Sequence, residues 1–202
     1  VLFRSDAGVA GGNQLLEHGD SGLAVLTELG YGPCALVIAA PADSDIRAVR
    51  DLAGRRIATS HPNLLQRHLA AADVEASIVA LSGSIELAPA IGAADAVCDL
   101  VSTGETLRQN GLRSLATVLQ SQAVLIARED HAGDARIAAL RTVVESVLSA
   151  RPKRYLMLNA PDAALDRVIT LLPGIDAPTI LPLARTDMHA VHAVVDAADV
   201  PR

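Results

Sequence analysis

The chain has 202 residues, half of them hydrophobic and 1% aromatic, so its core must be built from Ala, Val, Leu and Ile. Its net charge is −6 and it has no basic stripe or aromatic ladder, which argues against nucleic-acid binding. It has no apolar run long enough to span a bilayer and no signal-peptide pattern, which argues against a membrane or secreted protein.

Short apolar runs alternate with helical patterns over the first 81 residues. Strands are predicted at 6–11, 34–40, 55–59 and 76–81, and helices from Leu15, over 45–52 and over 64–72. This alternation predicts βαβ units and a mainly parallel sheet, whose ligands lie at the carboxyl ends of the strands. The loop 59–61 and the later loop 102–104 both follow predicted strands, so we expect them in one cleft.

The two cysteines, Cys34 and Cys98, lie in apolar strand-like runs and lack the spacing of metal ligands. We interpret them as buried thiols in a reducing compartment, the cytoplasm.

The stretch 82–112 carries the strongest chemical signal. Residues 93–101 form an apolar, β-branched run that predicts a strand, with Asp95, Val97 and Asp99 on one face. A Ser-Thr-Gly-Glu-Thr turn follows, and then a helical pattern that closes at Asn110-Gly111. Backbone N–H groups, three hydroxyls and a helix dipole make this turn suitable for an anion, and Gly104 allows close approach. An acid just upstream can bind sugar hydroxyls, so the pattern indicates a phosphorylated sugar; the alternative is an ordinary N-cap turn.

The rest of the chain contains a predicted linker, after which the order of the predicted elements changes. Residues 116–127 predict a strand region, 136–150 an amphipathic helix and 150–153 a linker. Strand, helix, strand and strand are then predicted at 155–158, 163–172, 178–183 and 189–195, the start of a ferredoxin-like βαββαβ unit. His189 and His192 point to opposite faces of the last strand, so we do not expect them to share a metal.

Many spaced positions resemble one family. The run Gly-Ser-Ile-Glu-Leu-Ala-Pro at 83–89, and the residues at 94–104, 106–107 and 110–112, resemble the signature of ATP phosphoribosyltransferase, which opens histidine biosynthesis. The resemblance extends from about Asp6 to about Val200 and includes 56–59, 62–64 and 178–180.

This resemblance implies an α/β fold with a two-lobed catalytic domain over 1–150, similar to a type II periplasmic binding protein. Its middle lobe covers about 31–119, and the other lobe combines the chain start with the helix from Arg136. An ACT-like, ferredoxin-like regulatory domain that binds histidine follows at 152–202. The family's first strand, basic loop and first helix would precede Asp6, and the regulatory unit lacks its last helix and strand. We therefore expect a chain truncated at both ends.

The resemblance implies transfer of phosphoribosyl from phosphoribosyl pyrophosphate (PRPP) to N1 of ATP, with Mg²⁺ and feedback inhibition by histidine. It also implies a homo-oligomer, a hexamer. A non-catalytic two-lobed binding protein, or an inactive paralogue or fragment, remains the alternative. The implied sites are the 5′-phosphate loop Ser102, Thr103, Gly104, Glu105 and Thr106; Asp99 and Glu86 for the ribose and the reaction; Arg56, Thr59 and His61 for nucleotide or phosphate; and Thr179 for histidine.

Several of these residues allow a second interpretation. Asp95 and Asp99 are roughly 13 Å apart on one strand, so only Asp99, nearer the turn, is assigned to the ribose. Glu86 either lines the cleft or sits at a helix start, where a carboxylate is favourable anyway. The family shows a basic residue and Asp where this chain has Gly12 and Asn13, so we expect only a turn there. The family often has an aromatic residue at His61, so this ring is a stacking substitute.

Overall fold

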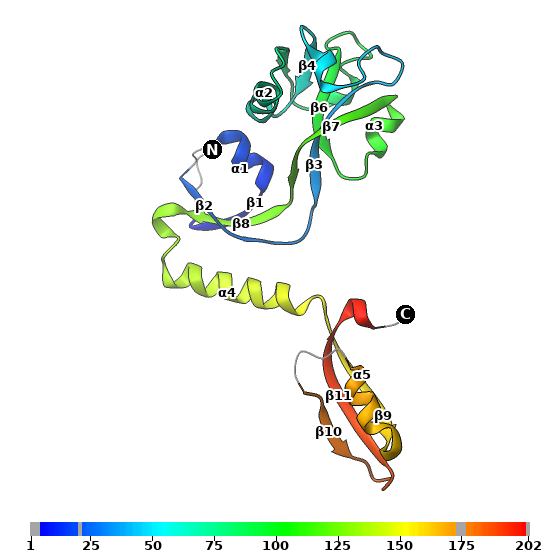
Figure 1. The fold of residues 1–202 in the computed structure, drawn as a ribbon. Helices are drawn as coiled ribbons and strands as arrows, with labels where there is room; N and C mark the ends of the chain where they lie inside the picture. The colour runs from blue at the N-terminus through cyan, green and yellow to red at the C-terminus, as the bar shows by residue number, and fades with distance from the viewer. Residues whose placement is uncertain (1–4, 20–21, 173–176, 201–202) are drawn as a thin grey trace. The chain divides into compact units, whose positions relative to one another are not determined.

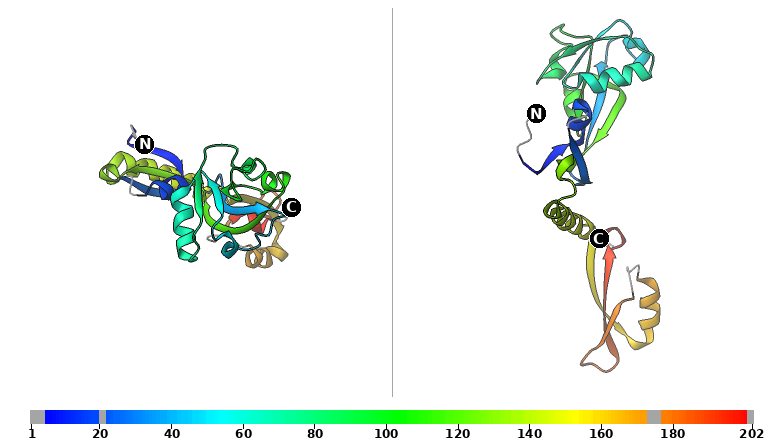
Figure 2. Two further views of the ribbon diagram at one scale, coloured as in Figure 1. Left: turned by 90° about the horizontal axis from the view of Figure 1, so that it is seen from above. Right: turned by 90° about the vertical axis from the view of Figure 1, so that its left-hand side faces the viewer.

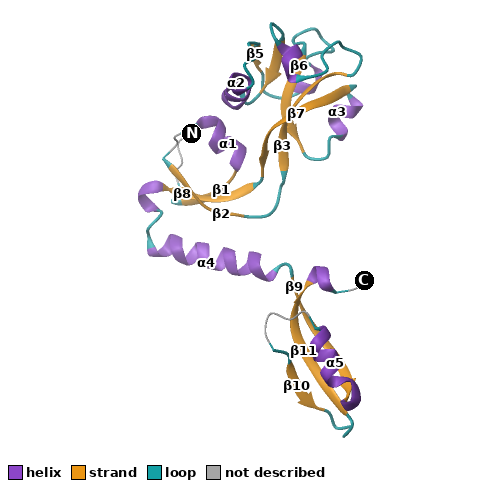
Figure 3. Ribbon diagram, viewed as in Figure 1, coloured by secondary structure: helices purple, strands orange, loops and turns teal. Residues whose placement is uncertain are grey.

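The structure is a computed structural model that describes residues 5–19, 22–172 and 177–200. The chain divides into two compact units, Val1–Arg141 and Thr142–Arg202, which are described separately below. The course of the chain is shown in Figure 1, two further views in Figure 2, and its helices and strands in Figure 3. Among the described residues, no helix combines the length and the apolar composition that crossing a membrane requires.

The first lobe of the first unit is built on a small antiparallel sheet. β8 (Ala123–Arg128) lies between β1 (Ala7–Gly11) and β2 (Leu23–Glu28), and α1 (Gly12–His18) follows β1 directly. The predicted strand region 116–127 is two strands, because the chain leaves β7 (Leu112–Ser121) at Gln122 and enters β8 in the other sheet. Gln122 marks this crossing, and its carbonyl accepts a hydrogen bond of 2.9 Å from the Gly12 N–H.

The second lobe is built on a mixed sheet with the strand order β5-β4-β6-β3-β7. Its remaining strands are β3 (Cys34–Pro41), β4 (Arg56–Thr59), β5 (Ser77–Ala80) and β6 (Ala96–Val101). β4 pairs in parallel with β5 and β6, whereas β3 pairs antiparallel with β6 and β7. The predicted parallel direction therefore holds for β4, β5, β6 and β7. β3 opposes them because it enters this lobe from the first one, and β7 returns there.

Helical segments cover both faces of this sheet. They are α2 (Pro62–Ala71), α3 (Glu105–Gln109) and the short 3₁₀ turns η1 (Val49–Leu52) and η2 (Ile85–Leu87). The helix predicted over 45–52 is only η1, because the Asp51 carboxylate accepts hydrogen bonds of 2.9 Å from the N–H groups of Arg47 and Ala48 and caps a single turn. A 3₁₀ turn, η3 (Glu129–His131), follows β8.

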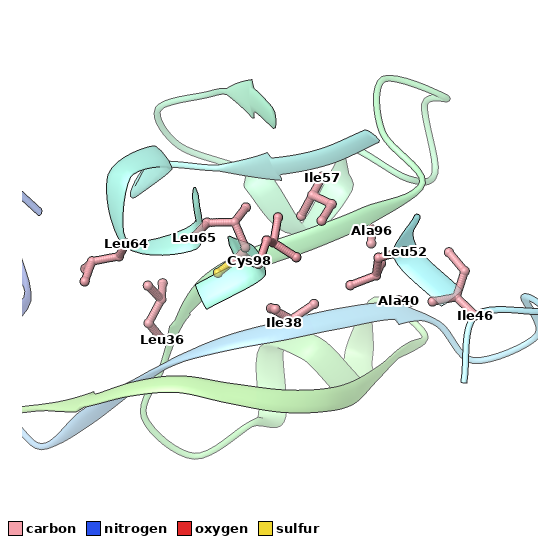
Figure 4. Packing of buried hydrophobic residues seen from close by; sticks show 11 residues of the cluster. Leu36, Ile38, Ala40, Ile46, Leu52, Ile57, Leu64, Leu65, Ala96 and Cys98 are labelled. Carbon is pink, nitrogen blue, oxygen red and sulfur yellow. The ribbon is translucent and has the colours of Figure 1, made fainter. Parts of the chain in front are cut away.

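Two buried clusters lie on opposite faces of the mixed sheet. Ile38, Ile57 and Cys98 pack with α2 and η1 on one face, as Figure 4 shows. Ala39 and Val97 pack with η2 and α3 on the other face. Adjacent residues of β6 thus point to opposite faces, as the predicted alternation requires. Cys98 is buried as expected, but Cys34, at the start of β3, is only half-buried.

A long helix, α4 (Ala135–Ala150), spans the division between the units. The second unit then contains β9 (Lys153–Pro161), η4 (Asp162–Ala164), α5 (Leu165–Leu171), β10 (Thr179–Pro182), β11 (Met188–Asp196) and η5 (Ala197–Asp199). β11 lies between β10 and β9 and is antiparallel to both. This order confirms the predicted β-α-β-β succession at the start of a ferredoxin-like unit.

Candidate active site

The carboxyl ends of β4, β5 and β6 lie at one edge of the mixed sheet. Thr59, the last residue of β4, is opposite Ala80, the last residue of β5, and opposite Cys98 of β6. The three parallel strands therefore run toward the same edge, where β6 continues beyond the other two to Val101. The loops that follow them, 60–61, 81–84 and 102–104, consequently project from the same edge. This is the edge nearest the first lobe, since β3 enters the sheet there and β7 leaves it there.

The turn between β6 and α3 is open to solvent. Ser102, Thr103, Glu105 and Thr106 are exposed, and Gly104 precedes the helix with a φ of 77°. The N-cap residue of α3 is Gly104, which has no side chain to cap the helix, and the N–H of Glu105 makes only a long contact of 3.5 Å to Thr103 Oγ1. The N–H groups of a helical first turn have no partner within the helix. The turn therefore offers hydroxyls and backbone donors to an incoming anion.

The Glu105 side chain does not take part in this arrangement. Its carboxylate pairs with the Arg108 guanidinium and accepts a hydrogen bond of 3.2 Å from the Gln109 amide. The Glu105 side chain thus lies along α3, and only its backbone N–H is available to an anion at the turn.

Asp99 lies two residues before the end of β6, on the face that η2 and α3 cover. Its Oδ1 accepts a 2.8 Å hydrogen bond from the Leu100 N–H. Burial raises the pKa of Asp99, the nearby Glu86 carboxylate raises it further, and His61 lowers it. A carboxylate that has lost part of its hydration is a strong acceptor for hydroxyl donors.

Glu86 lies in the first turn of η2, a position where the helix dipole favours a carboxylate. It also lines an open hollow of about 560 Å³, together with Pro41, Ala42, Asp43, Pro89, Ala90, Asn110, Gly111 and Leu112. That hollow does not include the 102–106 turn. Glu86 interacts with the site through its electrostatic effect on Asp99.

Thr59 and His61, which were predicted to contact nucleotide or phosphate, are both buried. Thr59 is fully buried, and its Oγ1 accepts a 3.0 Å hydrogen bond from the His61 N–H. The Thr59 hydroxyl also donates a hydrogen bond to the Cys98 sulfur. The His61 side chain is 2% exposed, so as placed it cannot stack on a base. The loop residue between them, Ser60, is exposed.

The His61 ring instead contacts the first lobe. Its Nε2 lies 2.9 Å from Asn13 Nδ2 and 3.2 Å from Gln14 Nε2, and its Nδ1 lies 2.9 Å from Ser60 Oγ. With two amide donors at Nε2, the ring accepts there and carries its proton on Nδ1, which donates to Ser60. Burial lowers the pKa of His61, in agreement with a neutral ring.

Asn13 and Glu17 are functional-site neighbours that the sequence did not reveal. Asn13 is buried and its N–H donates a 2.8 Å hydrogen bond to Ser121 Oγ, so it does more than form the expected turn. Glu17, four residues later on the same face of α1, is also buried. The available signal was this pair of polar residues at helical spacing.

Arg56 does not join the other predicted site residues. It begins β4, whereas Thr59 ends it, so Arg56 lies at the opposite edge of the sheet from the open turn. Its guanidinium donates to both oxygens of Asp95, at 3.1 and 3.3 Å, and to the Gly92 carbonyl at 3.1 Å. In this structure the Arg56 guanidinium is thus held by Asp95 and Gly92, away from the open turn.

Thr179 belongs to the second unit, where it is exposed on β10 opposite His192 of β11. His192 contacts the Tyr155 hydroxyl at 3.0 Å, and His189 lies 2.9 Å from Asp162 on the other face. The two histidines therefore have separate partners. Within the described parts of the chain, no group of three or more His, Cys, Asp or Glu side chains could hold a metal ion.

Comparisons with known proteins agree with this architecture. The family model for ATP phosphoribosyltransferase (HisG) matches residues 4–147, and that for the HisG C-terminal domain matches residues 150–202. A curated ATP phosphoribosyltransferase from Haloarcula marismortui is 43% identical over 192 residues, which cover 95% of this chain and 68% of the relative.

Solved structures give the same picture. The ATP phosphoribosyl transferase (HisG:HisZ) complex from Thermotoga maritima matches with a TM-score of 0.61 and 26% identity, over 72% of this chain and 71% of that one. The periplasmic aliphatic sulphonate binding protein SsuA from Escherichia coli matches with a TM-score of 0.53 and 25% identity, over 72% and 55%. The match to SsuA shows that this chain has the two-lobed fold of periplasmic binding proteins.

Proposed function

The chain belongs to the ATP phosphoribosyltransferase family, and we propose that it transfers the phosphoribosyl group of PRPP to N1 of ATP and releases pyrophosphate. This pentosyl transfer is the first step of histidine biosynthesis. The observation that carries the proposal is the open Ser102–Thr106 turn at the end of β6, with the partly buried Asp99 just before it.

The turn fits the 5′-phosphate of PRPP. The hydroxyls of Ser102, Thr103 and Thr106 and the first N–H groups of α3 are exposed on one short segment, and the positive φ of Gly104 shapes it. Donors arranged in this way hold a phosphate without a nearby Lys or Arg. They fix the end of the sugar farthest from the reacting carbon, so their contribution is to positioning.

Asp99 fits the ribose hydroxyls. The transfer develops positive charge at the anomeric carbon while pyrophosphate leaves with negative charge, and it needs no side-chain nucleophile. A carboxylate that holds the adjacent hydroxyls orients the ring and also stabilises the positive charge. Glu86 acts on the same reaction by adding to the effect of burial, which raises the pKa of Asp99.

The site is compatible with Mg²⁺ that is bound to the phosphates of the substrate. Magnesium usually keeps several waters and binds one or two carboxylates together with substrate phosphates. Asp99 and Glu86 are the interacting carboxylates of the site, and the described residues show no larger metal-ligand cluster. When bound, the ion would neutralise charge on the departing pyrophosphate.

Regulation and assembly are proposed from the family alone. We place the histidine-inhibitor site on the second unit, with Thr179 of β10 as a contact, and we assign the chain to a homo-hexamer in the cytoplasm. Thr179 is exposed on the edge strand β10, so it is accessible to a ligand. Light scattering tests the hexamer, and a histidine titration of the transfer rate tests the inhibitor site.

Pyrophosphate release tests the activity itself. The enzyme should release pyrophosphate only when ATP, PRPP and Mg²⁺ are all present. The alternative, a binding protein without chemistry, is favoured by the fold shared with a sulphonate binding protein. Tight binding of PRPP with no pyrophosphate release over many hours would establish that alternative and contradict transfer.

A further inference from the structure

Two helices of different lobes cap each other. α1 follows the first strand of the first lobe, and α2 follows β4 in the second lobe. The hydrogen bonds between them join residues 46 to 51 positions apart in the sequence. They connect the lobes on the side where β4, β5 and β6 end, beside the proposed substrate site.

The first cap is the Glu17 carboxylate. One oxygen accepts a 2.8 Å hydrogen bond from the Asn63 N–H and the other a 2.9 Å bond from the Leu64 N–H. These N–H groups belong to the first turn of α2, where the helix supplies no acceptor of its own. The residue before the helix, His61, gives no side-chain cap. A buried carboxylate of the other lobe therefore fills the capping position.

The second cap runs in the reverse direction. The Asn63 amide donates a 3.1 Å hydrogen bond to the Glu17 carbonyl, and the Arg67 guanidinium donates to the Leu16 carbonyl. Both carbonyls are in the last turn of α1, where they lack helical partners. Each helix thus satisfies the orphan groups of the other, and separation of the lobes would expose both sets.

A third contact connects this pair to the site. The side-chain amides of Asn13 and Gln14 contact the Nε2 atom of His61. The His61 N–H donates a hydrogen bond to Thr59 Oγ1. Thr59 in turn is hydrogen-bonded to Cys98, the residue before Asp99. We infer that these contacts of α1 with the 59–67 segment, the α1–α2 clasp, hold the two lobes at a fixed separation before any substrate binds. Glu17 is then a positioning residue for the transfer reaction, an assignment that rests on the proposed function.

Distance measurements test the clasp directly. Spin labels at Val9→Cys in the first lobe and Gln66→Cys in the second, in a Cys34→Ser background, report the lobe separation by double electron–electron resonance; both positions are exposed. We expect one narrow distribution that PRPP leaves unchanged. With Glu17→Ala we expect a broader distribution that PRPP narrows. A wild-type distribution that shifts or narrows with PRPP would overturn the inference.

Kinetics and amide exchange separate positioning from general stability. Glu17→Ala should speed hydrogen exchange at the Asn63 and Leu64 amides at least tenfold. It should raise the KM for PRPP about tenfold and leave kcat within twofold, because substrate must now select the closed lobes. Glu75→Gln, which removes an exposed carboxylate after α2, is the matched control and should change neither. Unchanged exchange and KM in Glu17→Ala would contradict the clasp.

A milder variant tests the clasp if Glu17→Ala folds poorly. Asn63→Ala removes one bond and keeps both N–H groups that bind Glu17, so it should broaden the distance distribution partially. The distance and exchange measurements need no catalysis. If the wild type released no pyrophosphate, the proposed function would fail while these measurements still decided the clasp.

Discussion

The Nδ2 atom of Asn13 lies 2.9 Å from the Nε2 atom of His61, so a buried amide of one lobe contacts a buried imidazole of the other. Their contact explains why neither residue is simply part of a turn or a loop. Both belong to the α1–α2 clasp, beside the site and not in it.

This contact predicts a loss of stability in mild acid. Burial lowers the pKa of His61 from its ordinary value of 6.5, so the folded chain binds fewer protons than the unfolded chain. The stability from the neutral ring is complete above pH 6.5 and is lost as the pH falls through the lower folded pKa. The unfolding midpoint in urea, measured between pH 8 and pH 5, should therefore fall. His61→Gln should flatten this dependence, and an equally steep fall in the variant would contradict the assignment.

Gly104→Ala should weaken PRPP binding at least tenfold. A Cβ at this position would meet only Val101 Cγ1 at 3.9 Å, an ordinary contact, so the cost comes from the φ of 77°. We expect about 1–2 kcal/mol of strain, which the chain can relieve by moving the turn. Gly92→Ala is the control, because Gly92 also has a positive φ and open space but lies away from the turn. It should lose similar stability in urea unfolding and keep the KM for PRPP.

Asp99→Asn should lower kcat/KM about 100-fold, the usual effect of removing one charged stabilising group. It should also raise stability at neutral pH. Because burial raises the pKa of Asp99, ionisation costs folding free energy as the pH rises from 3.8 through the folded pKa, and an amide avoids this cost. Urea unfolding at pH 7 measures the gain. A variant that was both less stable and fully active would contradict the role of Asp99.

Glu86→Gln should move the acidic limb of the kcat/KM profile to lower pH. The wild-type limb should lie above 3.8, since burial and the Glu86 charge both raise the pKa of Asp99. Removal of that charge removes one of the two effects that raise the pKa of Asp99 and leaves the effects of burial, the Leu100 N–H and His61 in place. Glu75→Gln, far from Asp99 in the fold, is expected to leave the limb in place. A limb unmoved by Glu86→Gln would show that Asp99 does not set it.

Arg56→Ala should leave the KM for PRPP and for ATP unchanged. Its guanidinium binds Asp95 and the Gly92 carbonyl at the amino end of β4, so the variant loses only this surface contact. Because Arg56 lowers the pKa of Asp95, the contact stabilises the fold above the ordinary range of a carboxyl group, and this effect ends in acid. A rise in either KM would restore the phosphate role that the structure argues against.

Local patterns predicted the part of the site that is continuous in sequence. The alternation around Val97, the hydroxyls of 102–106 and the Asn110-Gly111 end specify β6, the turn and α3 through short-range chemistry. The phosphate role of Arg56 came from the family resemblance, whereas the predicted strand 55–59 already put Arg56 at the opposite end from the loop 59–61. The contacts of Arg56 with Asp95 and the Gly92 carbonyl join residues 39 and 36 positions apart, so no single segment encodes them.

The α1–α2 clasp could not be predicted from the sequence, because its contacts join residues that are far apart in the chain. Glu17 and Asn63 are 46 residues apart, and each looks like an ordinary polar residue near a helix end. Only the tertiary fold brings the last turn of α1 against the first turn of α2. His61 was likewise placed in an exposed loop, because its burial depends on Asn13 and Gln14 from the other lobe.

The most direct test is a titration of the isotope-labelled chain with ribose 5-phosphate, which carries the terminal phosphate and the ribose hydroxyls but no leaving group. Amide resonances of Gly104, Glu105 and Thr106 should shift in nuclear magnetic resonance spectra, and ribose without phosphate should leave them in place. Saturable shifts elsewhere, with these three amides unmoved, would show that the Ser102–Thr106 turn does not bind the sugar phosphate.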